Sequence, residues 1–257
     1  MSRHRIVWLL FFILCLLGFS LHGLAFFQSA IFWLNFLAFL AFFIYQSAVL
    51  SAEFFFPSIC KGNPSNQAVS LTFDDGPIEG YTDKILDILK AHGVKATFFC
   101  IGEQIQANEP LAKRIVDEGH IIGNHSYSHT KTFNLLSSSK VLDDILANDQ
   151  QIKAITGSIP NFFRPPFGVA NPMLADALSK SKHLSIGWSL RSFDSLIKQP
   201  ERLLQRLEKE TKAGDIVLLH DYADSMLTIL PAYIQFLQHS GLDIQRLDVL
   251  IDKAPYR

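Results

Sequence analysis

The sequence predicts an α/β fold built on a parallel sheet, preceded by a pair of membrane-spanning helices. Two observations support this prediction. From residue 68 to the end of the chain, short apolar runs alternate with amphipathic helical patterns, which is the pattern of consecutive strand–helix units in a parallel sheet. Before this region, residues 6–49 contain no Asp, Glu, Lys or Arg, and a long apolar stretch without charge is typical of membrane proteins.

The uncharged stretch is about twice as long as the ~20 residues that one helix needs to cross a bilayer. We therefore predict two transmembrane helices, at about 6–27 and 31–49. A cleaved signal peptide is the alternative for the first span, because two arginines precede it. Its apolar run exceeds the roughly 7 to 15 residues of a signal peptide core, and no convincing cleavage site follows. Residues 1–52 are thus predicted to be a multi-pass anchor in the cell membrane.

The rest of the chain divides into a linker and one domain. Residues 53–67 include two prolines, one glycine and two asparagines, a composition typical of a linker. Residues 68–257 are enough for one core and fit a single domain. The net charge of -1 and the lack of a Lys/Arg cluster in the domain argue against nucleic acid as a partner. Its two cysteines, Cys60 and Cys100, do not indicate a disulfide framework and leave the compartment open.

Within 68–257 we predict six or seven strands with helices between them. In chain order, the predicted strands are 68–73, 96–101, 120–123, a short strand before Arg164, 184–188 and 215–219. The predicted helices are 82–91, 107–118, 137–155, 172–179 with Asn171 as its N-cap, 200–212 and 225–239. This periodicity fits both a closed barrel and an open doubly wound sheet.

Unusual polar residues follow several of the predicted strands. In a parallel sheet the carboxyl ends of the strands lie on one face, and catalytic groups gather there. Asp74 and Asp75 end the first strand of the domain, and two adjacent carboxylates at the end of an apolar strand are costly unless a positive charge compensates them. A bound metal would supply that charge. The alternative is a turn, because Asp-Gly-Pro is favourable turn chemistry.

His125 and His129 are four residues apart, so on one turn of helix both imidazoles would point to the same side and could bind one ion. Two surface histidines in a polar loop are the alternative. Together with an Asp from another strand end, the pair forms a set of three ligands that leaves a coordination position open for water. An open position is typical of catalytic rather than structural metal sites.

The spelling and order of five motifs identify a family: TFDDGP (72–77), HSYSH (125–129), RPPFG (164–168), WSLRSFD (188–194) and LLH (218–220). This series resembles the polysaccharide deacetylase (NodB-type) family. The resemblance extends from about residue 68 to the end of the chain and leaves the membrane hairpin outside it. It implies a distorted (β/α) barrel with about seven parallel strands, and a hydrolase that removes the acyl group from an amino sugar.

The resemblance also implies a role for each matched position. Asp75, His125 and His129 match the metal ligands of the family, with Zn2+ the usual ion and Co2+, Ni2+ or Mn2+ also possible. The catalytic groups that it implies are Asp74 as general base, Arg164 as its orienting partner, the Phe167 N–H as oxyanion donor, His220 as general acid and Asp194 as the residue that tunes it. The substrate contacts that it implies are Leu218, Pro165, Trp188 and Arg191.

Two positions depart from the family's fourth motif. Arg191 replaces an Asp, and Ser195 replaces a Trp that lines the substrate groove, so the way in which the sugar is held is open. Arg191 could meet an anionic group on the substrate, such as a phosphate or a carboxylate. A structural salt bridge is the alternative. The other histidines, namely His92, His120, His183 and His239, are interpreted as helix ends or core groups.

The substrate depends on the side of the membrane that the domain faces. Arg3 and Arg5 precede the first span, which favours a cytoplasmic N-terminus, and two spans return the domain to that side. Family members that act on wall polymers face outward. An outward domain would act on an N-acetylglucosamine-containing envelope glycan, and a cytoplasmic one on an amino sugar carried by a polyisoprenyl phosphate. A catalytically silent glycan-binding protein is a third hypothesis.

Overall fold

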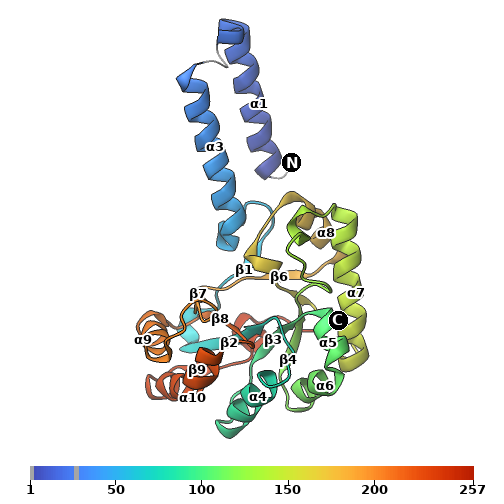
Figure 1. The fold of residues 1–257 in the computed structure, drawn as a ribbon, viewed down its shortest axis with the longest axis vertical. Coiled ribbons are helices and arrows are strands. Elements are labelled where there is room, and N and C mark those ends of the chain that lie inside the picture. The colour runs from blue at the N-terminus through green and yellow to red at the C-terminus, as the bar shows by residue number, and fades with distance from the viewer. Residues whose placement is uncertain (1–2, 26–28) are drawn as a thin grey trace.

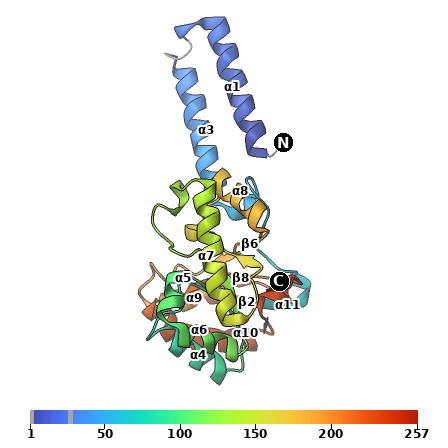
Figure 2. The ribbon, with the colours of Figure 1, turned by 90° about the vertical axis from the view of Figure 1, so that its right-hand side faces the viewer.

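Two long apolar helices precede the globular domain in the computed structural model, which describes residues 3–25 and 29–257. Helices α1 (Arg3–His22) and α3 (Ala30–Ala48) lie side by side, with the rings of Phe11 and Phe39 stacked 4.0 Å apart, and project from one end of the domain (Figures 1 and 2). Both helices are long and apolar enough to cross a membrane. The end of the first predicted span lies outside the described residues.

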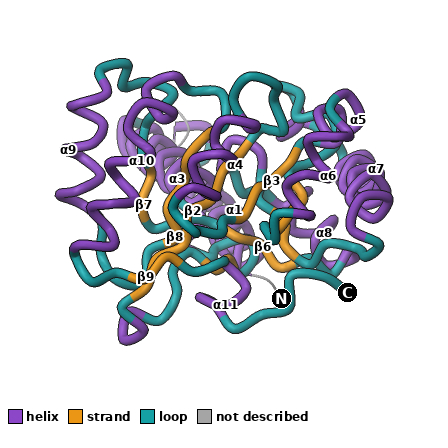
Figure 3. The backbone as a smooth tube through the Cα atoms, turned by 90° about the horizontal axis from the view of Figure 1, so that it is seen from below, coloured by secondary structure: helices purple, strands orange, loops and turns teal. Residues whose placement is uncertain are grey.

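A nine-stranded sheet forms the centre of the domain, and all strand pairings in it are parallel (Figure 3). The six strands predicted from the sequence are present, and the additional ones have only two residues each. The spatial order is β1-β6-β5-β4-β3-β2-β8-β7, with β9 beside β2. Their bounds are β1 Ser58–Ile59, β2 Ala68–Asp74, β3 Thr97–Cys100, β4 Ile121–Asn124, β5 Phe162–Phe163, β6 Leu184–Ile186, β7 Leu190–Arg191, β8 Ile216–His220 and β9 Asp243–Ile244.

One short segment joins the two sides of this sheet into a distorted barrel. The predicted strand at 184–188 is interrupted in the structure: β6 pairs with β5, and β7, only four residues further on, pairs with β8. Gly187 lies at the interruption, where a Cβ atom would lie 2.5 Å from the sulfur of Cys60, so a larger residue would not fit. The barrel expected from the family resemblance is therefore confirmed.

The helices cover the outside of the barrel, and most follow their predicted ranges. α8 begins as expected, because the side chain of Asn171 accepts a hydrogen bond from the Leu174 N–H and Pro172 occupies the first position. The predicted helix at 107–118 is α6, and a short helix that was not predicted, α5, precedes it and ends next to Asn108. The helices are α4 Thr82–Ala91, α5 Gly102–Ala107, α6 Glu109–Asp117, α7 Ser138–Thr156, α8 Pro172–Ser181, α9 Pro200–Glu210, α10 Asp224–His239 and α11 Leu247–Ile251.

The segment 53–67, predicted as a linker, contributes to the barrel. β1 adds to the edge of the sheet beside β6, and Gly62 N–H donates a hydrogen bond to the Gly214 carbonyl just before β8. Phe54 and Phe55, near the start of this segment, are buried. The prolines and glycine of this segment favoured the prediction of a linker. Its contacts with the domain left no sign in the sequence, because the residues that it contacts are distant along the chain.

The register of the strands brings the predicted site residues together. Asp74 at the end of β2 is aligned with His220 at the end of β8 on one side and with Phe99 of β3 on the other. Asn124, at the end of β4, precedes His125. Every residue of β2 is buried, so the carboxylates at its end are held by a strand that is enclosed on both faces. The carboxyl ends of the strands thus form the floor of one site.

Candidate active site and metal centre

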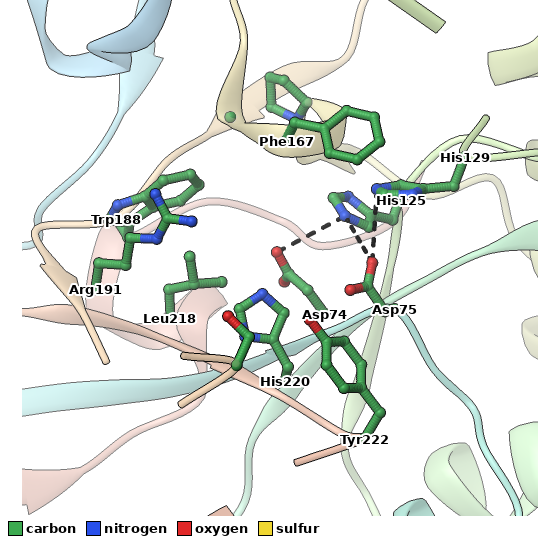
Figure 4. A pocket seen from close by; sticks show the side chains of 13 residues that line it. Asp74, Asp75, His125, His129, Phe167, Trp188, Arg191, Leu218, His220 and Tyr222 are labelled. Atoms are coloured by element: carbon green, nitrogen blue, oxygen red, sulfur yellow. Dashed lines mark ion pairs between the residues drawn. The ribbon is translucent and has the colours of Figure 1, made fainter. Parts of the chain in front are cut away.

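A pocket at the carboxyl ends of the strands contains ten of the twelve site residues predicted from the sequence (Figure 4). The other two, Arg164 and Asp194, lie buried directly behind it. Three of the lining residues, Gly168, Ser195 and Tyr222, were not assigned to the site. The pocket is lined by Asp74, Asp75, His125, His129, Pro165, Phe167, Gly168, Trp188, Arg191, Ser195, Leu218, His220 and Tyr222.

Asp75, His125 and His129 form a cluster that fits a divalent metal ion. Their potential ligand atoms all lie within 4.8 Å of one another, and Asp75 Oδ1 is 3.4 Å from His125 Nε2 and 3.6 Å from His129 Nε2. Asp75 Oδ1 and His129 Nε2 are buried without a hydrogen-bond partner. Buried polar atoms without partners are costly, and one ion between them would satisfy both.

The protonation of the two histidines suits metal binding. His125 Nδ1 lies 2.8 Å from the Arg164 carbonyl, so it donates a proton to that oxygen and leaves the lone pair of Nε2 toward the cluster. Burial and the neighbouring His125 lower the pKa of His129 to about 4, so its imidazole is neutral at pH 7. His129 therefore offers Nε2 to an ion at pH 7, and His125 offers Nε2 once that nitrogen has lost its proton.

The histidines reach this geometry on a loop, which corrects the helical turn considered from their spacing. Residues 125–130 form no helix, and both Ser126 and His129 have positive φ angles, of 67° and 44°. Such backbone conformations are strained for residues other than glycine and persist only where surrounding contacts fix them. The His125 and His129 rings nevertheless lie 4.8 Å apart.

Helix α7 supplies the contacts that fix this loop. The Asp144 carboxylate accepts hydrogen bonds from the N–H groups of Tyr127 and Ser128 and from the Ser128 hydroxyl. One turn later, the Asn148 side chain donates to the carbonyl of Ser126 and to the side chain of Asn124. Neither residue was identified from the sequence, because both belong to an ordinary amphipathic helix and act through residues that are distant along the chain.

Arg164 is completely buried behind Asp74 and connects three parts of the barrel. Its Nη1 donates to Asp74 Oδ1 and to Thr72 Oγ1, each at 2.7 Å, and its other nitrogens donate to the carbonyls of Ile186 and Gly187. Asp74 is itself 4% exposed. With one oxygen held by Arg164, the Asp74 carboxylate turns its other oxygen toward the metal cluster, 3.8 Å from His125 Nε2.

His220 lies beside Asp74, its partner in the pairing of β2 with β8, and is oriented by Asp194. Asp194 Oδ1 lies 2.7 Å from His220 Nδ1, and Asp194 Oδ2 accepts a hydrogen bond from the His220 backbone N–H. Burial alone would lower the pKa of His220, but the hydrogen bond and charge of Asp194 outweigh burial and raise it. His220 Nδ1 is therefore hydrogen bonded to Asp194, and His220 Nε2 is the nitrogen that can exchange a proton in the pocket.

The remaining predicted residues form the walls and the rim. Leu218 is buried in the floor, and Trp188 packs against Gly168 so closely that a Cβ there would lie 2.3 Å from the indole. Phe167, 49% exposed with φ of +60°, extends over the ring of His129. Arg191 is exposed at the rim, with its guanidinium 5.0 Å from the ring of Phe193.

Arg191 forms no ion pair with any residue in the described part of the chain, so the alternative of a structural salt bridge is not realised there. Of the unassigned residues, Tyr222 has its ring 5.2 Å from that of His220. Its place two residues after His220 was the only signal for it. The four histidines left out of the site lie at helix ends or in the core: His92, His120, His183 and His239.

Comparison with known proteins agrees with this fold. The family model of the polysaccharide deacetylases matches residues 61–184. The chain is 33% identical over 204 residues to the peptidoglycan-N-acetylmuramic acid deacetylase PdaA of Bacillus subtilis, with 76% of each protein covered. It therefore belongs to the polysaccharide deacetylase family, a family of hydrolases that act on non-peptide carbon–nitrogen bonds.

Two further relatives are a deacetylase and a pseudoenzyme, so membership of the family does not by itself establish activity. The chain is 32% identical over 194 residues to the peptidoglycan-N-acetylglucosamine deacetylase PgdA of Listeria monocytogenes. The matched region covers 76% of this chain and 41% of PgdA. A solved structure described as a pseudoenzyme of carbohydrate esterase family 4, from Bacillus anthracis, has a TM-score of 0.69 and 33% identity, with 75% of this chain and 68% of that chain covered. The residues of the site, not the fold, must therefore decide activity.

Metal binding should weaken as the pH falls. Burial alone would lower the pKa of His125, but the carboxylates of Asp74 and Asp75 raise it above the ordinary 6.5. A proton on Nε2 then competes with the ion at any pH below this raised value. Competition with a chromophoric chelator, measured from about pH 8.5 to 5.5, should show the affinity falling from a point above pH 6.5. An affinity independent of pH over this range would contradict the assignment of His125 as a ligand.

Asp144→Ala should weaken metal binding by about 10- to 100-fold, the usual effect of removing a group that orients metal ligands. The reason is that two N–H groups of the histidine loop would lose their shared acceptor. Asp143→Ala is the matched control, because Asp143 is the exposed neighbour on the same helix. Equal affinities of the two variants, with circular dichroism showing both folded, would refute the role of Asp144.

Proposed function

We propose that this protein is a metal-dependent deacetylase that removes the N-acetyl group from an amino sugar of an N-acetylglucosamine-containing envelope glycan. One observation above all supports the proposal: the buried, unpartnered Asp75 Oδ1 and His129 Nε2 lie in one pocket with Asp74, and His220 lies beside Asp74 in the same pocket (Figure 4). The cluster of one carboxylate and two imidazoles is typical of catalytic zinc, and cobalt, nickel and manganese also accept such ligands.

In the proposed mechanism, Asp75, His125 and His129 hold the ion, which when bound lowers the pKa of a water molecule and polarises the amide oxygen. Asp74 takes a proton from the attacking water as general base. Arg164 fixes the orientation of this carboxylate, since its Nη1 donates a hydrogen bond to Asp74 Oδ1 at 2.7 Å. The backbone N–H of Phe167 donates to the developing oxyanion.

His220 completes the reaction by protonating the leaving amine, which departs poorly without a proton. The raised pKa of His220 keeps it cationic to a higher pH than an ordinary histidine, and Asp194 balances the charge. Leu218 forms the wall against which the acetyl methyl packs, while Pro165, Trp188 and Arg191 contact the sugar. The chain thus has a base and an acid in one pocket, as hydrolysis of an amide requires.

A catalytically silent glycan-binding protein is the weaker hypothesis, although the family includes a pseudoenzyme. A silent site has no need to retain costly buried charges. Here Asp74 and Arg164 are both buried and paired, and the orienting contacts of His125 and His220 are both made. The chain retains each group that the proposed chemistry uses.

A deacylase of an amino sugar on a polyisoprenyl phosphate, removing acetyl or formyl, is the second candidate. One observation favours it: Arg191 is an exposed cation at the pocket rim that has no ion pair in the described part of the chain. A guanidinium in this position can bind a phosphate in bidentate fashion.

The anchor is also part of the proposal. We take residues 1–52 as a two-helix anchor in the cell membrane and 68–257 as the catalytic domain. Both ends of the hairpin reach the domain: Arg5 lies beside Asp176 of α8, and α3 leads into it. The start of α1 and the domain therefore share one side of the proposed membrane. Arg3 and Arg5, in the first turn of α1, favour the cytoplasmic side, which suits the polyisoprenyl phosphate substrate rather than the envelope glycan.

The first test uses full-length protein in detergent with zinc or cobalt and N-acetylated chitooligosaccharides, with released acetate as the measurement. Asp75→Ala should abolish the metal-dependent release by removing a ligand. Asp74→Asn should lower kcat by about 10²- to 10⁴-fold, the usual contribution of a general base, while metal stays bound. If folded, metal-loaded wild type released no acetate, the proposed deacetylation of glycans would be disproved. The sugar linked to a polyisoprenyl phosphate would then be the candidate substrate.

Asp194→Asn should shift the alkaline limb of the pH–rate profile to lower pH. His220 must be protonated to act as the acid, so activity is lost as the pH rises through its pKa, and removal of the Asp194 charge lowers that pKa. The profile of kcat against pH measures the shift. An unmoved alkaline limb would show that another group is the acid.

A further inference from the structure

The anchor and the wall of the pocket are in direct contact. Near the end of α3, the Ser47 carbonyl accepts a hydrogen bond of 2.8 Å from the Ala170 N–H, two residues after the RPPFG motif. Leu50, Phe54 and Phe55 then form an apolar cluster with Ala170, against which Trp188 packs. Trp188 is also a wall of the catalytic pocket. One layer of side chains thus separates the pocket from the base of the hairpin.

The length of α3 defines the level of the membrane surface at this contact. The helix has 19 residues and its candidate span covers all of them, Ala30–Ala48. A rise of about 1.5 Å per residue makes such a helix just long enough for the ~30 Å core of a bilayer. The end of α3 therefore lies at the surface of the membrane, and Ala170, hydrogen bonded to Ser47, lies at the same level.

Exposed apolar side chains occur on the same edge of the domain. Leu135 is 84% exposed and Met173 is 46% exposed, at the end of a short 3-10 turn and in the first turn of α8. The Asn171 side chain donates to the Asn134 carbonyl and so joins these two elements. In both, a neighbouring apolar residue packs inward, which leaves Leu135 and Met173 without partners in the described part of the domain.

Phe167 extends the same edge to the mouth of the pocket. It lies between Arg164 and Ala170 in sequence and is 49% exposed, over the ring of His129. We define Leu135, Phe167 and Met173 as the membrane edge. α8 lies directly below the hairpin in Figures 1 and 2, so the edge continues the surface at which the two apolar helices leave the domain.

We propose that the membrane edge inserts into the interfacial layer of the bilayer and holds the pocket mouth at the lipid surface, so that the preferred substrate is an amino sugar tethered to that same bilayer. Exposed apolar side chains beside a transmembrane helix are stabilised by burial at the lipid boundary. A tethered sugar then meets the pocket without the cost of bringing a free molecule to it. This inference rests on the proposed membrane anchor and on the proposed deacylation.

The test uses the full chain in phospholipid nanodiscs and two substrates with one sugar. The first is a synthetic N-acetylglucosamine joined through a phosphate to a long hydrocarbon chain in the disc, and the second is N-acetylglucosamine 1-phosphate in solution. The double variant Leu135→Asp/Met173→Asp should lose at least about tenfold in kcat/KM toward the tethered sugar and keep its rate toward the soluble one. Val249→Asp is the control, because Val249 is 55% exposed on α11 and should change neither rate.

Amide hydrogen exchange provides a second readout that does not need activity. Residues 133–136 and 170–174 should exchange more slowly in nanodiscs than in detergent for the wild type, and the double variant should lose this protection. Equal exchange in the two media, or equal losses of the double variant on both substrates, would overturn the membrane edge. Failure of the wild type to cleave either sugar, with protection intact, would refute the proposed deacylation and leave the edge supported.

Discussion

The buried pair of Arg164 and Asp74 is the constraint on which the rest of the structure depends. Two charges without solvent are stable only if their hydrogen-bonding groups have partners. Arg164 meets this condition with Thr72 and Asp74 on β2 and with the carbonyls of Ile186 and Gly187 at the interruption between β6 and β7. The Arg164 side chain therefore fixes both the carboxylate of Asp74 and the segment that closes the barrel. Loss of one partner would leave the other charge buried and unpaired.

The two halves of the site are built around that fixed carboxylate by different means. On the metal side, a loop with positive φ angles is held from outside by Asp144 and Asn148 of α7. On the side of the proposed acid, His220 is the last residue of β8, so strand pairing fixes its backbone. Asp194 then orients its ring and accepts a hydrogen bond from its backbone N–H. The chemistry proposed for this protein needs both halves at once, which explains why several strained residues lie in one pocket.

The pair of apolar helices, α1 and α3, is structurally continuous with this site. The RPPFG motif contributes the buried Arg164 at its beginning and, two residues after its end, the contact of Ala170 with Ser47. Trp188 has a similar double position, because one side of it lines the pocket and the other packs on the cluster at the base of the hairpin. Both features place the pocket next to the surface where the two apolar helices leave the domain, and they are the basis of the proposed link between the substrate and the membrane.

Local patterns in the sequence by themselves determined the alternation of strands and helices, the two apolar helices and the residues at the strand ends, because amphipathic spacing and motifs such as TFDDGP act over a few residues. Only the tertiary structure decided how the barrel closes at Gly187, that β1 joins the sheet, that β9 and α11 exist, and that Asp144 supports the metal loop. Each of these rests on contacts between residues far apart in the chain. The free energy of such contacts depends on which residues the fold brings together, and a local sequence pattern does not contain that information.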